Sequence, residues 1–495
     1  MEKSIIKLLN SYSIDAWFCG GTARDLFLGN TPYGWDIAVK ADLATLRSKL
    51  TSKIVSTNEY STSMIIKYMD REYTLFPLKK IELINTYYNY SFTDSLQEDS
   101  NTRDFTINAL YYNPITNEWF DFHNGMTDID NRLIRFIGTP EIRILESKIR
   151  LLRAPILSAI LGEWWTIEVN TCNAIIKHKL KIATINPRQV NVELTKLFLR
   201  AAVPSKAFKM FRHLELLEDF FPELQRCIDV EQSNKATGLD LFQHIMYAID
   251  SISPTKSNTL ILRLAALLHD VGKPYTEVLI DDKVHFYNHE NVGAYLAEKI
   301  MYRWGFGKLL IGKIIFLIQN HLFDASSSKS ETSIKKLIQK IGIENIHDLL
   351  DLRIADRFGT GRSDIKMDNI HRLRDRINKI ISTQNIEHFQ LALTDEELID
   401  ELKGNTVFLE DSLPELKSYL SFKILSGKLQ NKTVNLKRAI NKIIKIPCPL
   451  DTPHLIKTWS DLQKGSADTF PDGKLKCGVF CNFICNRKLE TDYKL

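Results

Sequence analysis

The segment from Cys19 to Asp36 constrains this chain more than any other, because it combines a glycine pair, a basic residue and one acid in a fixed order. The backbone at Gly20 and Gly21 can approach a phosphate closely, since glycine carries no side chain. Arg24 can pair with the same phosphate through two parallel hydrogen bonds. A catalyst that works with bound metal ions also needs carboxylates nearby. Asp36 is present there, whereas two acids are expected.

The spacing of apolar residues predicts an α+β fold, in which an α/β head precedes a mostly helical body. From Glu141 onward, apolar residues recur three and four positions apart almost without interruption, as in Ile149–Leu161 and Val192–Ala201. The strand-like segments are Ala16–Cys19, Trp35–Val39, Ser63–Lys67 and Glu72–Leu75. The joints rich in turn formers are Ile137–Pro140, Ser251–Ser257, Ala325–Lys329 and Ile446–Pro449.

Length and charge limit the class of protein. A chain of 495 residues predicts roughly three domains of about 150 residues. Hydrophobic residues make up 44% and charged residues 25%, which is typical of a globular protein with a full core. The net charge of +5 comes from 65 basic and 60 acidic residues, so it permits a nucleic-acid partner without requiring one.

The chain predicts a cytoplasmic protein with reduced thiols and no membrane partner. Its first residues lack the apolar core of a signal peptide, and no later apolar run is long enough to span a bilayer. Seven scattered cysteines do not resemble a disulfide framework. Cys477, Cys481 and Cys485 recur every fourth residue, which suits either one buried helix face or a metal site, and we favour the buried face.

A second polar cluster runs from Glu98 to Leu110. Arg103 in it can hold a triphosphate, and Asp104 can cap the helix that follows. An ordinary capping segment explains the cluster equally well when it is considered alone.

Together, the two segments resemble the class II tRNA nucleotidyltransferase and poly(A) polymerase family. The resemblance lies in a glycine pair followed by Arg-Asp, then Leu-Gly and an acid, then Arg-Asp-Phe-Thr-Ile-Asn-Ala. It continues through Asp121–Asp128, Arg132–Arg135 and Arg150–Ala154 and covers about the first 225 residues. The resemblance implies a nucleotidyltransferase head at 1–138 and a helical neck that binds nucleotide and RNA at 139–225.

In that family the head holds two magnesium ions with an Asp-x-Asp pair and adds nucleotides from ATP or CTP to the 3′ end of tRNA without a template. The resemblance therefore implies that Asp36 is a catalytic magnesium ligand, that Arg24 and Arg103 contact the triphosphate, and that Arg150 and Arg153 read the base. The implied nucleotide-binding residues are Gly20, Gly21, Arg24, Asp25, Arg103, Asp104, Asn108, Arg150 and Arg153.

Four positions depart from the family pattern. Gly34 stands in place of the first metal carboxylate, and Ser147 stands in place of the acid of the neck motif Glu-Asp-x-x-Arg. Ile156 replaces an arginine, and Pro187 replaces the acid of a Glu-Arg pair. These changes indicate altered specificity or a lost activity of the head. Glu72 is either a replacement carboxylate or an exposed glutamate at a strand end, and we favour the latter.

A further set of residues lies in the helical middle of the chain. The apolar run 264–268 ends in His269 and Asp270, and buried acids need a partner, often a metal. The ordered set resembles the HD phosphohydrolase superfamily, which implies a domain at 226–390, a divalent transition metal, catalysis at Asp270 and a phosphate contact from Lys273. The implied metal ligands are His244, His269, Asp270, His289, His321 and Asp356.

Residues 391–495 are predicted to be a C-terminal helical region. Asp395–Leu402 and Val434–Ile446 suit helices, and the second carries Lys437, Arg438, Lys442 and Lys445. We favour a solvated basic face there over a tRNA contact.

Two hypotheses follow. The first is an enzyme that adds C, A or both to tRNA 3′ ends, or to other RNA 3′ ends, with a head impaired by Gly34. The alternative is a metal-dependent HD phosphohydrolase, acting on phosphomonoesters or 2′,3′-cyclic phosphates, whose head is a degenerate RNA-binding platform.

Overall fold

The computed structural model describes residues 2–58, 62–84, 87–231, 238–281, 283–324, 329–361, 367–383, 391–403, 416–417, 420 and 429–444. The chain divides into two compact units, Met1–Phe220 and Phe221–Leu495, and each is described by itself. The cysteines at 477, 481 and 485 and the segment Asp451–Leu495 lie outside the described residues. The further division of the first unit into a head and a neck stays a prediction.

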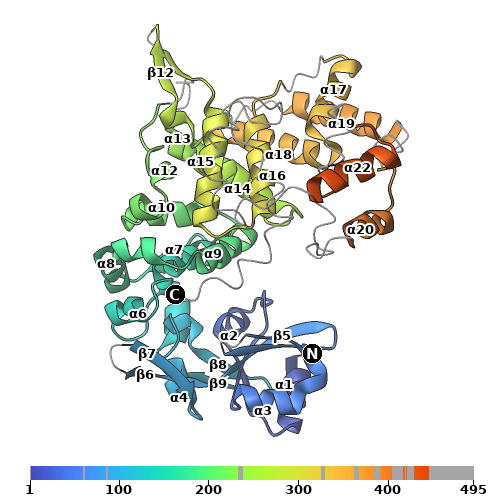
Figure 1. Cartoon of the computed structure of the whole chain (residues 1–495). Helices are drawn as coiled ribbons and strands as arrows, with labels where there is room; N and C mark the ends of the chain where they lie inside the picture. The colour runs from blue at the N-terminus through green and yellow to red at the C-terminus, as the bar shows by residue number, and fades with distance from the viewer. Residues whose placement is uncertain are drawn as a thin grey trace, which may run out of the picture. The chain divides into compact units, whose positions relative to one another are not determined.

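A mixed sheet forms the base of the first unit (Figure 1), with strand order β3-β4-β5-β2-β1-β8-β9. The four predicted strands are confirmed. β1 pairs antiparallel with β2, whereas β2 pairs parallel with β5 and places Asp36 opposite Thr74. The strands are β1 (Ala16–Cys19), β2 (Asp36–Val39), β3 (Ile54–Asn58), β4 (Ser63–Tyr68), β5 (Arg71–Pro77), β8 (Leu110–Asn113) and β9 (Glu118–Asp121).

Apolar side chains of α1 (Glu2–Ser11) and α3 (Leu43–Leu50) pack on this sheet. Ile5 and Leu46 are fully buried against Phe18 and Leu75 of the strands. Burial of such side chains stabilises a fold by about 1.5–3 kcal/mol each. The core therefore holds β1 and β2 side by side. Gly20 and Gly21, which directly follow β1 and are called the glycine turn below, thus lie at the same end of the two strands as the start of β2.

The rest of the first unit is mainly helical, as predicted. A separate hairpin of β6 (Lys79–Ile84) and β7 (Tyr87–Phe92) precedes it, and β10 (Leu133–Ile134) pairs with β11 (Thr166–Ile167). The helices are α2 (Gly20–Phe27), α4 (Leu96–Ser100), α5 (Gly125–Asp130), α6 (Pro140–Glu146), α7 (Arg150–Leu161), α8 (Val169–Lys177), α9 (Pro187–Arg200), α10 (Ser205–His213) and α11 (Leu217–Phe220).

The second unit is a helical bundle with one hairpin, β12 (Glu277–Ile280) and β13 (Lys283–Phe286). The expectation of nearly uninterrupted helix is wrong at this hairpin, where β-branched Val278, Ile280 and Val284 favour strands. The helices are α12 (Pro222–Gln225), α13 (Leu241–Asp250), α14 (Thr259–Leu268), α15 (His289–Arg303), α16 (Lys308–Asn320), α17 (Glu331–Ile341), α18 (Ile343–Gly359), α19 (Asp368–Thr383), α20 (Asp395–Lys403) and α22 (Thr433–Ile444).

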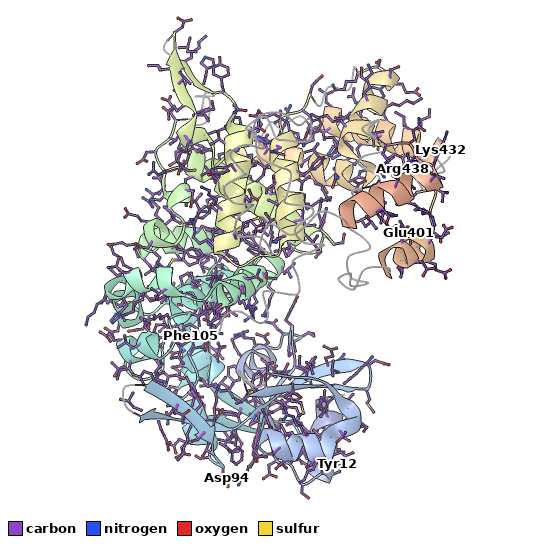
Figure 2. The ribbon with its side chains drawn as sticks, viewed as in Figure 1. Tyr12, Asp94, Phe105, Glu401, Lys432 and Arg438 are labelled. Carbon is purple, nitrogen blue, oxygen red and sulfur yellow. The ribbon has the colours of Figure 1, made fainter. Side chains whose placement is uncertain are left out.

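The two predicted C-terminal helices are confirmed as α20 and α22, and they contact each other. Lys437 Nζ lies 2.7 Å from Glu401 Oε1, whereas Arg438 and Lys432 are exposed near it (Figure 2). Lys437 is therefore paired within the protein, whereas the side chains of Lys442 and Lys445 lie outside the part of the chain that the structure describes. Across the described ranges, no helix has both the length and the apolar character that crossing a bilayer requires.

Candidate functional site

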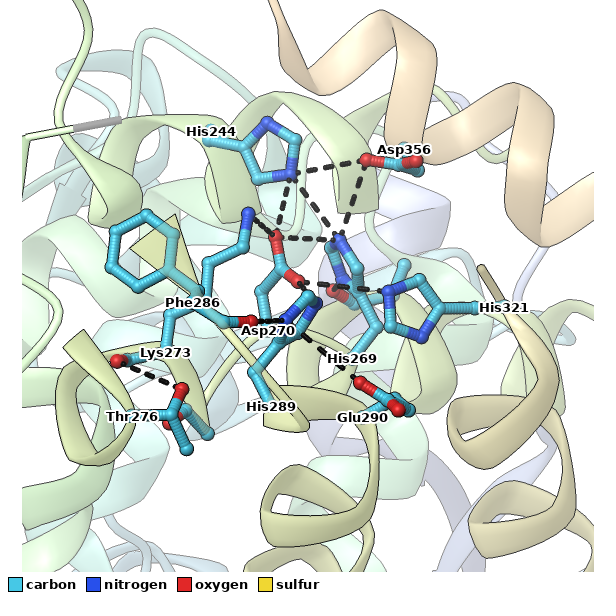
Figure 3. A network of polar contacts seen from close by, with 12 residues as sticks. His244, His269, Asp270, Lys273, Thr276, Phe286, His289, Glu290, His321 and Asp356 are labelled. Atoms are coloured by element: carbon cyan, nitrogen blue, oxygen red, sulfur yellow. Dashed lines mark hydrogen bonds and ion pairs between the residues drawn. The ribbon is translucent and has the colours of Figure 1, made fainter. Parts of the chain in front are cut away.

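Six side chains that lie on or at the ends of five helices converge in the second unit (Figure 3). Ligand atoms of His244, His269, Asp270 and Asp356 lie within 4.8 Å of one another, and those of Asp270, His289 and His321 form a second such group. Asp270 belongs to both groups. The structure thus brings together the whole predicted ligand set, across 112 positions of sequence from the first to the last.

The local sequence explains why these side chains meet. The apolar helix α14 is almost entirely buried and ends at Leu268, so His269 and Asp270 follow at its buried end. Two glycines allow the neighbouring backbones to approach. A Cβ at Gly272 would lie 2.3 Å from the carbonyl oxygen of His289, and one at Gly359 would lie 2.7 Å from the ring of His244. A side chain at either position would force the ligands apart.

Three of the histidines are oriented by the backbone three residues before them. Nδ1 of His269 lies 2.8 Å from the carbonyl oxygen of Ala266, and His289 and His321 make the corresponding contacts at 2.7 Å and 2.6 Å. A carbonyl only accepts, so Nδ1 carries a proton in each of them, and Nε2 is the ring nitrogen left to bind a metal ion in the neutral imidazole. This arrangement orients Nε2 for a metal ion.

Charges in the cluster shift the pKa of its members strongly. Burial opposes the charged form of His269, but Asp270 and Asp356 outweigh it and raise its pKa to about 10. Burial, together with charged His269, lowers the pKa of His321 to about 4. Burial also opposes ionisation of Asp270, yet His269 and Lys273 hold its pKa well below the usual range. An ionised carboxylate thus lies at the centre of the cluster.

These residues fit a divalent metal ion. Nε2 of His289 is buried without a hydrogen-bond partner among the described residues, and it lies 3.4 Å from Asp270 Oδ1. Nε2 of His244 lies 3.2 Å from Nε2 of His269, so the two ring nitrogens face each other. Lys273 Nζ lies 2.6 Å from Asp270 Oδ2. A mixed set of imidazoles and carboxylates suits a transition metal better than magnesium, which prefers oxygen.

In the first unit, Asp36 begins β2 beside the glycine turn. Thr22 Oγ1 donates to the carbonyl oxygen of Gly34 at 2.9 Å and accepts from the amide of Asp36 at 2.7 Å. Burial raises the pKa of the Asp36 carboxyl, and nearby cations oppose this rise: Arg103, Lys196, Arg200 and Arg24. A Cβ at Gly34 would meet no atom within 4 Å. The position of the missing acid is therefore open.

The predicted triphosphate residue Arg103 lies on the other side of the turn. Its Nε and Nη2 donate to Asp99 Oδ2 at 3.1 Å and 2.7 Å. A Cβ at Gly20, whose φ is +61°, would lie 3.8 Å from both Arg103 Nη1 and Asp36 Oδ2. Only glycine adopts this backbone easily. The glycine turn thus lies between a guanidinium group and the metal-ligand candidate.

The other predicted nucleotide residues form a continuous network. Arg24 pairs with Asp25 at 2.6 Å and donates to Asn108 at 2.6 Å, and Asn108 donates in turn to Asp104. Asp104 Oδ2 lies 3.3 Å from Arg153 Nη1. The prediction that Asp104 caps a helix is wrong. Phe105 is the N-cap of a short 3-10 helix, and Asp104 accepts the adjacent Phe105 amide because its second oxygen faces Arg153.

Arg150 is buried in the first unit. Its Nη1 donates to Glu146 at 2.7 Å and to the carbonyl oxygen of Arg143, and its Nη2 donates to the carbonyl oxygen of Thr102. Arg153, by contrast, is 38% exposed. Base reading by both arginines stays a prediction.

Four charged residues of this site lie outside the set of site residues that the sequence predicts: Asp99, Glu193, Lys196 and Arg200. Asp99 precedes Arg103 by four positions, and Glu193 precedes Lys196 by three, so helical spacing could have suggested both pairs. No local signal places Arg200 near Asp36, because that proximity depends on the packing of α9 against the head.

Comparison with known proteins agrees with these two sites. Residues 16–135 match the model of the poly A polymerase head domain, 165–228 match a probable RNA and SrmB-binding site of polymerase A, and 239–360 match the HD domain. The CCA-adding enzyme of Leuconostoc mesenteroides is 31% identical over 201 residues, which are 39% of this chain and 48% of that protein. Separate segments of the chain thus match a poly A polymerase head domain and an HD domain.

Other relatives are similar over comparable lengths. Poly(A) polymerase I of Escherichia coli is 27% identical over 235 residues, or 44% of this chain and 49% of that enzyme. The chain thus spans about half the length of the curated relatives it matches. The crystal structure of the Bacillus stearothermophilus CCA-adding enzyme in complex with CTP has the same fold, with a TM-score of 0.58 and 18% identity over 89% of this chain and 96% of that one. The nucleotidyltransferase and HD families are metal-dependent.

Proposed function

We propose that the head transfers nucleotides from ATP or CTP to the 3′ end of tRNA, or of another RNA. The observation that carries this proposal is the meeting of Asp36, Arg103 and the turn at Gly20 within a head of the matching family. Asp36 would hold magnesium, which supplies charge stabilisation at the phosphoryl group that is transferred. Arg24 and Arg103 bind and orient the triphosphate.

The open position at Gly34 defines how far this head departs from its relatives. A second carboxylate is absent there, so the site has fewer ligands for hard cations. We infer a slow transferase, or one with altered specificity. C addition, A addition or both remain possible products of the proposed reaction.

The test is incorporation of labelled ATP and CTP, supplied separately and together, into a tRNA transcript that lacks its terminal nucleotides. Incorporation by the wild type with magnesium, lost in Asp36→Asn, supports the proposal. Asp15→Asn removes an exposed carboxylate ahead of β1 and is the matched control. No incorporation with any nucleotide or metal would defeat the proposal.

The second unit supports a different activity. We propose that it is a metal-dependent phosphohydrolase acting on phosphomonoesters or 2′,3′-cyclic phosphates of RNA ends. The convergence of six ligand side chains around ionised Asp270 supports this proposal. A divalent transition metal held there would supply an activated water. Lys273, next to Asp270, would bind the phosphate of the substrate.

Hydrolysis of 2′,3′-cyclic AMP and of a generic aryl phosphate, with manganese, nickel or cobalt added in turn, tests this second function. Asp270→Asn should abolish turnover. Asp375→Asn, an exposed carboxylate on α19, should leave it unchanged. Wild-type protein that loads metal but hydrolyses neither ester would count against the proposal.

The finer assignments are also proposals: magnesium at the head, a transition metal at the cluster, and a cytoplasmic location. They rest on the donor chemistry of each site and on the sequence.

A further inference from the structure

Arg200 is a cation of the head site that the sequence pattern did not single out. It is the last residue of α9, and its guanidinium carbon lies 4.6 Å from the centre of the Tyr33 ring. Its Nη2 lies 4.0 Å from Asp25 Oδ2, and its side chain is 23% exposed. Tyr33 is the direct neighbour of Gly34 and is 68% exposed. Arg200 therefore contacts the residue next to the position where a carboxylate is missing, and a Cβ at that position meets no atom within 4 Å.

The pairing of charges around Asp36 distinguishes Arg200 from the other cations. Arg103 is held by Asp99 at 2.7 Å, and Lys196 is held by Glu193 at 3.0 Å. Asp25 Oδ1 already accepts two hydrogen bonds from Arg24, at 3.0 Å and 2.6 Å.

Arg200 therefore shares the Asp25 carboxylate with Arg24, and the distance from Arg200 to that carboxylate is too long for a hydrogen bond. Within the described part of the chain, it is the cation of this group that lacks a carboxylate at close range.

The position of Arg200 makes it available to an anion. The ring of Tyr33 holds the guanidinium by a cation–π contact and leaves its edges, which carry the N–H groups, accessible. Burial lowers the pKa of Arg200, and repulsion from Arg24 lowers it further. The charges of Asp25, Tyr33 and Asp36 oppose this change. The guanidinium thus lies among the groups that face the glycine turn.

We propose that Arg200, held by Tyr33, binds the triphosphate of the substrate. Because residue 34 is a glycine, it cannot help to hold a metal ion, and the fixed guanidinium of Arg200 supplies positive charge that such an ion would otherwise provide. The inference rests on the proposed transferase function and names how its site holds the substrate. The head therefore binds a triphosphate partly without metal. Arg24 and Arg103 contribute at the glycine turn, and Arg200 contributes from α9.

The alternative is that Arg200 only fastens α9 to the segment before β2. If this alternative holds, loss of Arg200 lowers the stability of the protein but leaves its affinity for triphosphate unchanged. Measuring triphosphate binding directly, in the full chain and without turnover, distinguishes the two explanations.

The experiment is calorimetric titration of inorganic triphosphate and of ATP, each in EDTA and in magnesium. Arg200→Gln should weaken binding in EDTA by about tenfold, the loss of one or two charge-assisted hydrogen bonds. In magnesium the loss should be smaller. Arg200→Lys, which keeps the charge, should bind more tightly than Arg200→Gln. Lys209→Gln removes an exposed positive charge on α10 and should stay within about twofold of the wild type.

Three results would overturn the proposal: wild-type affinity of Arg200→Gln in EDTA, an equal loss in Lys209→Gln, or no triphosphate binding by the wild type in either buffer. Circular dichroism and thermal unfolding of each variant identify a folding defect, and Tyr33→Leu then tests the same contact from the other side. Its expected loss in EDTA is severalfold, and wild-type affinity would also overturn the proposal. If Arg200-dependent binding occurs but no nucleotide is incorporated, the transferase proposal fails and this inference stands.

Discussion

Arg153 Nε donates to Glu193 Oε1 at 3.0 Å and so joins α7 to α9. The same oxygen accepts from Lys196 Nζ at 3.0 Å, and Arg153 Nη1 reaches Asp104 at 3.3 Å. Glu193 is therefore an acceptor shared by two cations, and it is only 6% exposed. One carboxylate in the neck holds an arginine that faces the nucleotide network.

Loss of the Glu193 charge should loosen this arrangement. We expect Glu193→Gln to lower the free energy of unfolding by about 1–2 kcal/mol, a figure reduced for the partial exposure of Arg153. Denaturant unfolding followed by fluorescence measures it. The control is Glu215→Gln, whose partner Lys179 forms an exposed ion pair and whose loss should be nearly silent. Equal effects of the two variants would contradict the argument.

Lys206 on α10 should be a strong stability determinant. Its Nζ lies 3.0 Å, 2.7 Å, 3.0 Å and 2.6 Å from the carbonyl oxygens of Ser158, Gly162, Glu163 and Trp165, at the C-terminal end of α7. A cation at a helix C-terminus satisfies otherwise unpaired carbonyls. We expect Lys206→Met to lower the free energy of unfolding by about 1–3 kcal/mol.

Lys209→Met, on the same helix but exposed, is the matched control for Lys206. Its urea midpoint should equal that of the wild type. If the urea midpoint of Lys206→Met equals that of the control, water satisfies the four carbonyl oxygens as well as the ammonium group does.

Metal binding in the second unit should release a proton. The pKa of His269 in the metal-free protein is about 10, above its ordinary 6.5. The contribution of protonated His269 to the stability of the metal-free fold is therefore fully present below pH 6.5. It is lost as the pH rises through about 10. A metal must displace that proton from Nε2. We thus expect affinity to rise by about tenfold per pH unit between about pH 7 and the His269 pKa.

Calorimetric titration of manganese in buffers of different ionisation enthalpy counts the protons released. Release of about one proton near pH 7.5 is the expected value. A pH-independent affinity with no proton release would rule out protonated His269. The Asp270→Asn variant should show weaker binding and less proton release, because its charge holds the imidazolium.

Restoring the acid at residue 34 tests the head directly. A Cβ at Gly34 meets nothing within 4 Å, so Gly34→Asp should fold like the wild type. We expect nucleotide incorporation to rise by at least about tenfold, since the added carboxylate completes a metal pair with Asp36. Gly34→Asn, which has the same size without the charge, should give no gain. Equal incorporation by the three proteins would show that the head needs no acid there.

Glu72 then becomes the residue to examine. The parallel register of β2 and β5 sets Asp36 opposite Thr74, and alternation places exposed Glu72 on the same face, two residues toward the level of Gly34. If Glu72 only ends a strand, as we favour, Glu72→Gln keeps wild-type incorporation. Incorporation lost in Glu72→Gln but kept in Glu82→Gln, an exposed control on β6, would contradict that reading.

The parts of the structure that sequence reasoning predicted are those encoded locally. The apolar run before His269 and the alternating residues of β1 and β2 each carry their own periodicity. The metal cluster was predicted because its order of residues matches a known superfamily. Spacing along the chain would not have joined His244 to Asp356, which meet only through the packing of α13 on α18.

The parts that were missed depend on contacts between distant segments. Asp104 was expected to cap a helix, but Arg153 competes for its carboxylate. The hairpin β12–β13 was missed because each strand has only four residues, and β12 is exposed along its whole length, so no alternation of buried and exposed residues marks it. Arg200 lies at the end of a helix, where a solvated side chain is the ordinary expectation.

The predicted metal ligands of the second unit extend from His244 to Asp356 and come from five segments of the bundle, with His269 and Asp270 adjacent to each other. A nascent chain that has emerged only as far as His321, directly after α16, carries five of the six, without the carboxylate on α18. During synthesis on the ribosome, the complete site therefore cannot exist until α18 has emerged and packed on α13. Completion of the proposed metal site is thus a late event in the biogenesis of this protein.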